Sequence, residues 1–279
     1  MDNRFVDVDG VRLRYFEAGS GAAVLLLHGG SLGSSADVFS RIVPRLADAG
    51  LRAIAFDQPG FGLSAVPADH STHYRRESVP RLMDALGLRR AALMAHSQAG
   101  GAAVQLALAD PARYSHVVIL STGSLLPPAA EAGGAGSRPA REAAPREWQA
   151  GDAEPTLADT RRALEETVFN HALITEDAVA LRHSHSLGRN YRAFLARQAL
   201  GDEGGGKGGT PLWQRLTELS MPLLMIYGRQ DRARAAERAE HLKRLRPEID
   251  LHIVDGCKHM LPWDAEDELI RLAVPHLQK

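Results

Sequence analysis

The chain has 279 residues, 44% of them hydrophobic and 24% charged, which fits one large α/β domain with an insertion and excludes a chain that is disordered throughout. Its 33 basic and 34 acidic residues leave a formal net charge of -1, so we expect neither nucleic acid nor a membrane as a partner. The first ten residues show no signal-peptide pattern, and no apolar run approaches the roughly 18 residues of a membrane span, so we expect a cytoplasmic protein.

The first part of the chain alternates between strand and helix patterns. Phe5–Val8 and Val11–Phe16 alternate apolar and polar residues around Asp9-Gly10, which predicts an antiparallel hairpin. The strands expected next are Ala22–Leu27, Leu51–Phe56, Ala91–Ala95 and Val117–Leu120. The helices expected between them are Val38–Ala49, Arg75–Leu86 and Ala99–Ala109. Strands that are apolar throughout suit burial on both faces, so we predict a mostly parallel central sheet with helices on both faces.

The alternation stops after Leu120. Residues 127–155 are rich in Ala, Gly and Pro, residues 157–200 have a helical pattern, and a second low-complexity stretch covers 201–209. Strands and helices then alternate again, at Pro222–Tyr227, Arg232–Leu245, Ile249–Val254 and in a last helix that runs to the C-terminus. The middle of the chain therefore differs in class from its two flanks.

The simplest organisation is one α/β core that carries a helical lid. We predict that the core comprises 1–123 and 211–279, with the lid inserted at 124–210. Such an insertion lies above the carboxyl ends of the parallel strands, where ligands of open α/β sheets bind. The lid is thus expected to cover the site.

The sharpest local motif is AALMAHSQAGG at residues 91–101. An apolar strand leads into Ser97, and small residues then open a helix, which is the context of a nucleophile elbow. Ala95 and Ala99 stand where the G-x-S-x-G pattern has glycine. Taken alone, this segment fits a serine that caps a helix as well as it fits a nucleophile.

A serine nucleophile needs a base and a carboxylate that orients the base. His259 follows the predicted strand Ile249–Val254, and Asp231 follows Pro222–Tyr227, so the sheet brings both to the edge where Ser97 lies. The chain order Ser97, Asp231, His259 is used by one Ser–His–Asp fold and not by two others. We therefore predict that these three residues form a catalytic triad.

Acyl transfer also needs hydrogen-bond donors for an oxyanion. His28-Gly29-Gly30 follows a predicted strand, and glycines there let backbone N–H groups face the pocket. We predict that the backbone amides of Gly30 and Gln98 form the oxyanion hole, Gln98 being the residue after the nucleophile. His28 is interpreted as a brace for this loop.

Five segments together resemble the α/β-hydrolase family. They are LLLHGGSLG (25–33), FDQPGFGLSA (56–65), AHSQAGG (95–101), YGRQDR (227–232) and GCKHM (256–260). Because they span both parts of the predicted core, the resemblance implies an α/β-hydrolase fold with a helical lid. The dehalogenase and epoxide-hydrolase branches use Asp as the nucleophile, so Ser97 separates this chain from both.

The segment TVFNHALITEDAVALRHSHS at 167–186 is similar to the lid of meta-cleavage product hydrolases, which cut a carbon–carbon bond in ring-opened aromatic metabolites. The resemblance implies that Arg182 binds the dienoate end of the substrate, which a guanidinium can do in a bidentate way. Further candidate substrate-binding residues are Gly29, His96, Met260 and Trp263. The subfamily commonly has Asn before the nucleophile and Trp after the catalytic histidine, where this chain has His96 and Met260.

The leading hypothesis is a serine-triad hydrolase that cleaves a carbon–carbon bond in a vinylogous diketone from aromatic catabolism. A carboxylesterase or lactonase with the same triad is the alternative that His96 and Met260 favour, and a non-catalytic hydrolase-fold binding protein is a third. A single cysteine and the absence of an HExxH motif or a glycine-rich nucleotide motif predict no metal and no cofactor. The expected partner is a small-molecule substrate, and the sequence leaves a homodimer open.

Overall fold

The computed structural model describes residues 1–132, 153–201 and 209–279, so most of both low-complexity stretches lies outside the described residues. Strands β1 (Arg4–Val8) and β2 (Val11–Ala18) form the predicted antiparallel hairpin. Asp9 and Gly10 both have positive φ, 52° and 81°, as a tight two-residue hairpin turn requires.

One eight-stranded sheet forms the centre of the described structure, in the order β1-β2-β4-β3-β5-β6-β7-β8. Its other strands are β3 (Ala23–Leu27), β4 (Arg52–Phe56), β5 (Ala91–His96), β6 (Tyr114–Leu120), β7 (Leu223–Gly228) and β8 (Asp250–Val254). The pairs β1–β2 and β2–β4 are antiparallel, and the five other pairs of the sheet, from β4–β3 to β7–β8, are parallel. The predicted mostly parallel sheet is confirmed.

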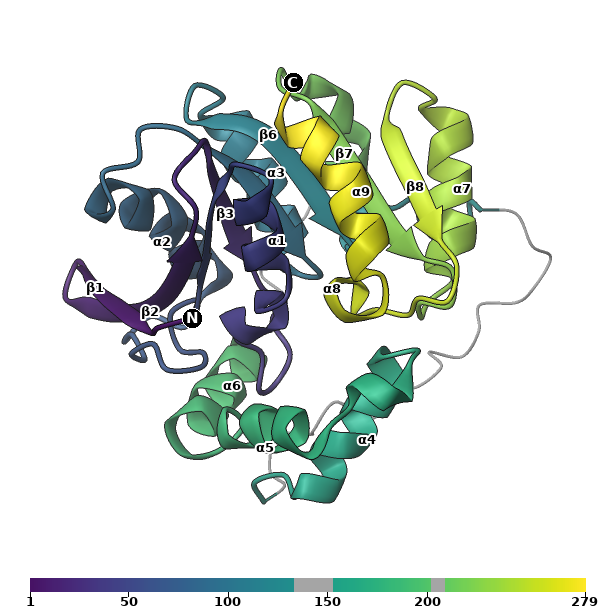
Figure 1. The fold of residues 1–279 in the computed structure, drawn as a ribbon. Coiled ribbons are helices and arrows are strands. Elements are labelled where there is room, and N and C mark those ends of the chain that lie inside the picture. Colours follow the sequence, from purple (N-terminus) through teal and green to yellow (C-terminus); the bar gives the residue numbers. More distant parts are fainter. Residues whose placement is uncertain (133–152, 202–208) are drawn as a thin grey trace.

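Alternate residues of the strands pack into two different cores. In β3, Leu25 and Leu27 belong to the core under α2, α3 and α7, whereas Val24 and Leu26 belong to the core under α1 and α9. The helices of the two layers are α1 (Ile42–Asp48), α2 (Thr72–Ala85), α3 (Ala99–Ala109), α7 (Ala235–Leu245), α8 (Leu261–Asp264) and α9 (Glu266–Leu277). Figure 1 shows α1 and α9 in front of the sheet. Burial on both faces explains why these strands are apolar throughout.

The helix expected over Val38–Ala49 is wrong in its extent. The structure has a short 3₁₀ helix at Ala36–Phe39 and begins α1 only at Ile42. Pro44 has no N–H to donate to the carbonyl of residue 40, so an unbroken helix through this point would lack a backbone hydrogen bond. Proline is tolerated in the first turn of a helix, and that is where Pro44 lies.

Three helices follow β6 in the chain and lie below the sheet in Figure 1. They are α4 (Leu157–Thr167), α5 (Glu176–Ser184) and α6 (Gly188–Leu200), and we call them the lid. Three short 3₁₀ helices lie at Gly123–Leu125, His171–Leu173 and Leu212–Glu218. The limits 124–210 of the insertion stay a prediction.

Contacts between the lid and the core include one at the end of α4 and one on α6. At the end of α4, the Met260 amide donates to the Thr167 carbonyl at 2.9 Å, and Met260 packs in an apolar cluster with Leu164 and Val168. On α6, the side-chain amide of Asn190 donates to the carbonyl of Gly62 at 2.9 Å. Gly62 lies in the loop after the carboxyl end of β4, and Met260 lies in the loop after the carboxyl end of β8. The lid therefore lies over the carboxyl edge of the sheet.

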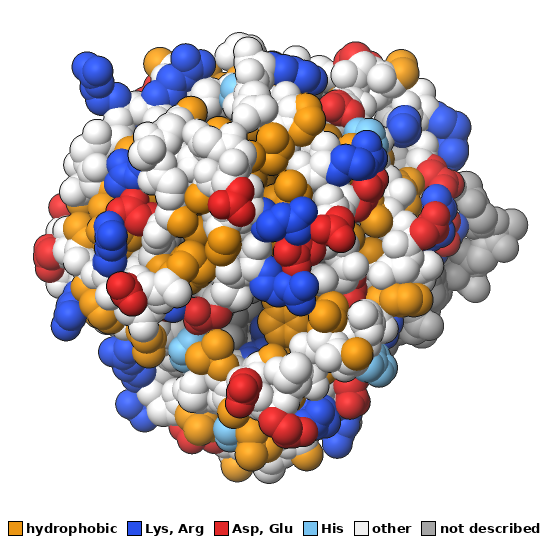
Figure 2. Space-filling model, in the orientation of Figure 1, with side chains coloured by type: hydrophobic (Ala, Val, Ile, Leu, Met, Phe, Trp, Pro, Cys, Tyr) orange, Lys and Arg blue, Asp and Glu red, His pale blue; other side chains and the backbone are white. Residues whose placement is uncertain are grey.

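The surface in view in Figure 2 intersperses Lys and Arg with Asp and Glu side chains. No helix in the described ranges combines the length and the apolar character that crossing a bilayer requires.

Candidate active site

Ser97 lies in the sharp turn between β5 and α3. Its φ of 57° is unusual for a residue with a side chain, and of residues 95–101 it is the one with positive φ. Alanine at 95 and 99 therefore carries no backbone strain. A Cβ on Gly100 would lie 2.1 Å from the Thr122 hydroxyl oxygen, and that hydroxyl donates to the Ser97 carbonyl at 2.7 Å. The close approach that needs glycine thus falls at Gly100.

His259 lies within hydrogen-bond distance of both Ser97 and Asp231. Nε2 of His259 is 2.8 Å from the Ser97 hydroxyl oxygen, and Nδ1 of His259 is 3.1 Å from each carboxylate oxygen of Asp231. The side chain of Asp231 is 3% exposed and that of His259 13%, so water hardly competes for these bonds. The arrangement can transfer the serine proton to the imidazole while the carboxylate holds the ring. The catalytic roles themselves stay a prediction.

Two loops position Asp231 and His259, and they bind each other. The Gln230 amide donates to the Cys257 carbonyl, and the Cys257 amide donates to the side-chain oxygen of Gln230, each at 3.0 Å. Helix α7 begins only at Ala235, so Asp231 does not cap it. The carboxylate is therefore available to the histidine.

The two amides expected to form the oxyanion hole lie on either side of the nucleophile. A Cβ on Gly29 would lie 3.0 Å from the Ser97 Cβ, which places the Gly29-Gly30 loop directly against the serine. Within the part of the chain that the structure describes, neither the Gly30 nor the Gln98 amide donates a hydrogen bond to a protein group. Free backbone donors beside a nucleophile suit a developing oxyanion.

His28 holds this loop in place. Its Nδ1 donates to the Gly29 carbonyl at 2.7 Å, and its Nε2 accepts from the Gln58 amide at 3.0 Å. Burial lowers the pKa of His28 to about 3, so the ring stays neutral and keeps both roles. These contacts support the interpretation of His28 as a brace.

His96 contacts His259, the predicted catalytic base. Its Nε2 donates to the backbone carbonyl of His259 at 2.8 Å, and the two ring centroids are 5.1 Å apart. Burial lowers the pKa of His96 to about 3, so this ring is neutral as well. His96 therefore fixes the backbone of the catalytic histidine and also lines the adjacent cavity.

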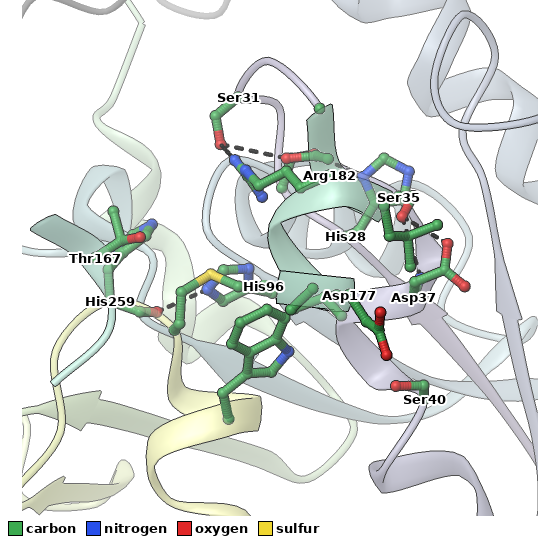
Figure 3. A pocket seen from close by; sticks show the side chains of 18 residues that line it. His28, Ser31, Ser35, Asp37, Ser40, His96, Thr167, Asp177, Arg182 and His259 are labelled. Atoms are coloured by element: carbon green, nitrogen blue, oxygen red, sulfur yellow. Dashed lines mark hydrogen bonds between the residues drawn. The ribbon is translucent and has the colours of Figure 1, made fainter. Parts of the chain in front are cut away.

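A cavity of about 260 Å³ lies between the lid and the triad, and we call it the lid cavity (Figure 3). All five residues expected to bind substrate line it, namely Gly29, His96, Arg182, Met260 and Trp263. Arg182 reaches in from α5, and its Nη2 is 3.4 Å from the Ser31 hydroxyl. Burial lowers the pKa of Arg182 to about 10, so the guanidinium is still charged at neutral pH. A cation in a small, partly apolar cavity suits one end of an anionic substrate.

A second cavity, of about 850 Å³, lies on the other side of the triad under α2. We call it the α2 cavity. Ser97, Gln98 and Arg75 are among its lining residues. The two cavities share His28 and His259, so they meet at these two histidines.

Sequence reasoning missed Arg75. It lies in the charged run Arg75-Arg76-Glu77, which is typical of the solvent-exposed face of a helix. The signal was nevertheless present, since Arg75 shares helical spacing with Val79 and Leu82, both of which are buried. An arginine at a core-facing position of an amphipathic helix is a candidate binding residue.

Comparisons with known proteins agree with this geometry. Residues 22–266 match the family described as the alpha/beta hydrolase fold. A 2-hydroxy-6-oxononadienedioate/2-hydroxy-6-oxononatrienedioate hydrolase of Burkholderia vietnamiensis is 29% identical over 99% of this chain and 96% of its own. A 2-hydroxy-6-oxo-6-phenylhexa-2,4-dienoate hydrolase of Comamonas testosteroni is 27% identical over 98% and 93%. The structure of a phenylhexadienoate hydrolase from a Rhodococcus species superposes with a TM-score of 0.82 at 22% identity, covering 100% of this chain and 99% of that one, which speaks for the fold alone.

Proposed function

The chain belongs to the α/β-hydrolase fold family, and we propose that it hydrolyses a carbon–carbon bond in a 2-hydroxy-6-oxo-dienoate, the class of compound that the names of its relatives give. The observation that carries the proposal is a Ser–His–Asp chain of hydrogen bonds beside a cavity into which the lid brings a guanidinium. A plain esterase needs the first feature but not the second. Arg182 supplies the positive charge that a dienoate requires.

The reaction begins with a proton shift within the substrate. Arg182 holds the C1 carboxylate and the C2 oxygen in the lid cavity, with the C6 carbonyl at Ser97. The C2 hydroxyl loses its proton and C5 gains one, which gives the 2,6-diketone. His259 is the group placed to carry this proton. In this tautomer C5 is tetrahedral and next to the C3–C4 double bond, so the electron pair of the C5–C6 bond can leave into the conjugated C2 ketone when that bond breaks.

Cleavage then follows the chemistry of acyl transfer. Ser97 Oγ attacks C6 while His259 takes its proton, and the amides of Gly30 and Gln98 bind the oxyanion. The C5–C6 bond breaks, its electron pair moves through the C3–C4 double bond onto the C2 oxygen, and that oxygen takes the proton from His259. The products of this step are a 2-hydroxydienoate and an acyl-serine.

Water completes the cycle. His259 accepts a proton from water, the resulting hydroxide attacks the acyl carbon, and Ser97 recovers its proton as the carboxylic acid leaves. The net reaction consumes one water and no cofactor. The backbone amides of Gly30 and Gln98 act both in the formation of the acyl-serine and in its hydrolysis, because a tetrahedral oxyanion forms in each of these steps.

The test is the visible absorbance of a meta-cleavage product, which is lost when conjugation is cut. We expect wild-type protein to bleach a 2-hydroxy-6-oxo-dienoate and Ser97→Ala to bleach it at least about 10³-fold more slowly. Far-UV circular dichroism checks that the variant folds. Hydrolysis of p-nitrophenyl acetate that depends on Ser97, without any bleaching, would overturn carbon–carbon cleavage and leave a carboxylesterase or lactonase.

A cytoplasmic location and a homodimer stay predictions from the sequence, as does the assignment of the individual site residues.

A further inference from the structure

Arg75 is a buried cation that has no acidic partner among the residues that the structure describes. The residue is 8% exposed, and its Nε has no hydrogen-bond partner among the described residues. Its Nη1 and Nη2 are 3.3 and 3.4 Å from the side-chain oxygen of Gln98, both near the limit of a hydrogen bond. Burial lowers the pKa of Arg75 to about 10. A guanidinium held this way is under-satisfied, because burying a charge without a counter-charge is unfavourable.

Two other arginines that line the α2 cavity, Arg76 and Arg238, differ from Arg75 in their partners. Arg76 pairs with Glu77 at 3.0 Å. Arg238 donates to the carbonyls of Pro127 and Gly123, each at 2.7 Å. Both guanidinium groups are therefore engaged, whereas within the described ranges the donors of Arg75 contact only the side-chain oxygen of Gln98.

A second buried cation raises the potential at the same place. Arg197 of α6 stacks on the Phe61 ring at 4.0 Å, and Arg75 faces that ring at 5.6 Å. Burial and, to a smaller extent, repulsion by Arg75 together lower the pKa of Arg197 to about 9. An anion at Arg75 would relieve this repulsion between α2 and the lid.

The position of Arg75 fixes which part of a substrate it would meet. A Cβ on Gly30 would lie 3.6 Å from Nη1 of Arg75 and 1.9 Å from the Gln98 side-chain oxygen. Arg75 thus lies beside the predicted oxyanion amide, in the cavity opposite the one that holds Arg182. A group that reaches Arg75 is only a few bonds from the carbonyl that Ser97 attacks, on its acyl side.

We propose that Arg75 binds a carboxylate on the acyl half of the substrate, so that the preferred substrate carries an acid at each end. This inference rests on the proposed function for the reaction. It assigns Arg75 as the residue that selects a short acidic acyl chain, as in the nonadienedioate that one relative's name gives, over an aryl ring, as in the phenylhexadienoate that another's gives. Arg182 takes the dienoate end in the lid cavity, and Arg75 takes the second acid in the α2 cavity. The Gln98 side chain, which contacts Arg75, adjusts to the incoming carboxylate.

The experiment compares two dienoates that differ only in the acyl substituent, a carboxyethyl group against a neutral propyl group. We expect wild type to prefer the diacid in kcat/KM, and Arg75→Gln to lower that preference about 10- to 100-fold, as loss of a charge-assisted hydrogen bond predicts. Arg75→Lys keeps the charge and should retain most of the preference. Arg81→Gln, on the same helix and 45% exposed, is the matched control and should keep it in full.

Two results would overturn the inference. If Arg75→Gln slows both dienoates equally, Arg75 serves the oxyanion or the fold instead of the substrate's acid. If wild type shows no preference for the diacid, the carboxylate site is wrong.

A second readout separates this inference from the proposed function. Succinate, the acid that a carboxyethyl substrate would release, should inhibit Ser97-dependent hydrolysis of p-nitrophenyl acetate more strongly than butanamide does. Arg75→Gln should remove that difference. If succinate inhibits wild type and Arg75→Gln equally, the carboxylate site is rejected, even where no dienoate is cleaved. If Arg75→Gln no longer distinguishes succinate from butanamide, the site is supported in that case too.

Discussion

Arg14 of β2 and Arg75 of α2 are buried to a similar degree, but their surroundings differ in the charged partners that they offer. Arg14 is 5% exposed and binds both carboxylate oxygens of Asp37, at 2.8 and 3.0 Å, and one oxygen of Asp57 at 3.3 Å. Arg75 has no such partner among the residues described. The difference teaches that the partner of a buried charge, rather than its burial, separates a structural role from a binding role.

The network around Arg14 joins the loops that follow β3 and β4. Asp57 accepts from the Ala36 amide at 2.7 Å and from the Leu63 amide at 2.8 Å. A Cβ on Gly62, whose φ is 51°, would lie 2.2 Å from a carboxylate oxygen of Asp57. Both carboxylates contact the Arg14 guanidinium, and Asp37 also lines the lid cavity, so the network supports the wall of that cavity.

The largest expected effect is on kcat, at Asp231, whose carboxylate is paired with the catalytic histidine. Asp231→Asn should lower kcat on the order of 10⁴-fold, because an amide no longer holds His259 in the tautomer that accepts the serine proton. The free energy of unfolding should change little. Absorbance kinetics measure the loss, and Asp255→Asn, whose side chain is 76% exposed, is the control. A variant that keeps a tenth of the wild-type kcat would show that Asp231 does not orient the base.

The next largest effect is a difference in the free energy of unfolding between substitutions of Arg14 and of Arg75. Arg14→Met leaves Asp57 buried without its cation and should lower the free energy of unfolding by about 3–5 kcal/mol. Arg75→Met removes a charge that has no acidic partner and should change it by less than about 1 kcal/mol. Urea unfolding measures both. Equal destabilisation by the two substitutions would break the comparison, since Arg75 would then be structural too.

Buried histidines give the smallest effect, and it depends on pH. Burial lowers the pKa of His276, which is 3% exposed, from 6.5 to about 4. Between these values the unfolded chain binds more protons than the folded one, so the free energy of unfolding falls as pH drops from 6.5 to 4. His276→Phe should flatten this slope by up to about 1.4 kcal/mol per pH unit. Parallel curves for variant and wild type, from urea unfolding at several pH values, would contradict the prediction.

The sequence was informative where local pattern and chain order carry the information. Ser97, Asp231 and His259 could be found because each follows an apolar strand, and parallel strands bring their carboxyl ends to one edge. The helix at Ala99–Ala109 was predicted with the observed limits, whereas the helix over Val38–Ala49 was not. Its division depends on Pro44 and on contacts of Asp37 with Arg14, a residue distant in the chain.

The sequence by itself determined the alternation of strands and helices, the nucleophile elbow and the order of the triad, because these depend on neighbours in the chain. Only the tertiary structure decided which arginine has an acidic partner. Nothing in the local sequence distinguishes Arg14 from Arg75. The partners of Arg14 lie 23 and 43 residues away in the chain, and the cavity beside Arg75 forms between α2, the nucleophile elbow and the strand ends. Pairing of buried charges is a long-range property, and no local pattern specifies it.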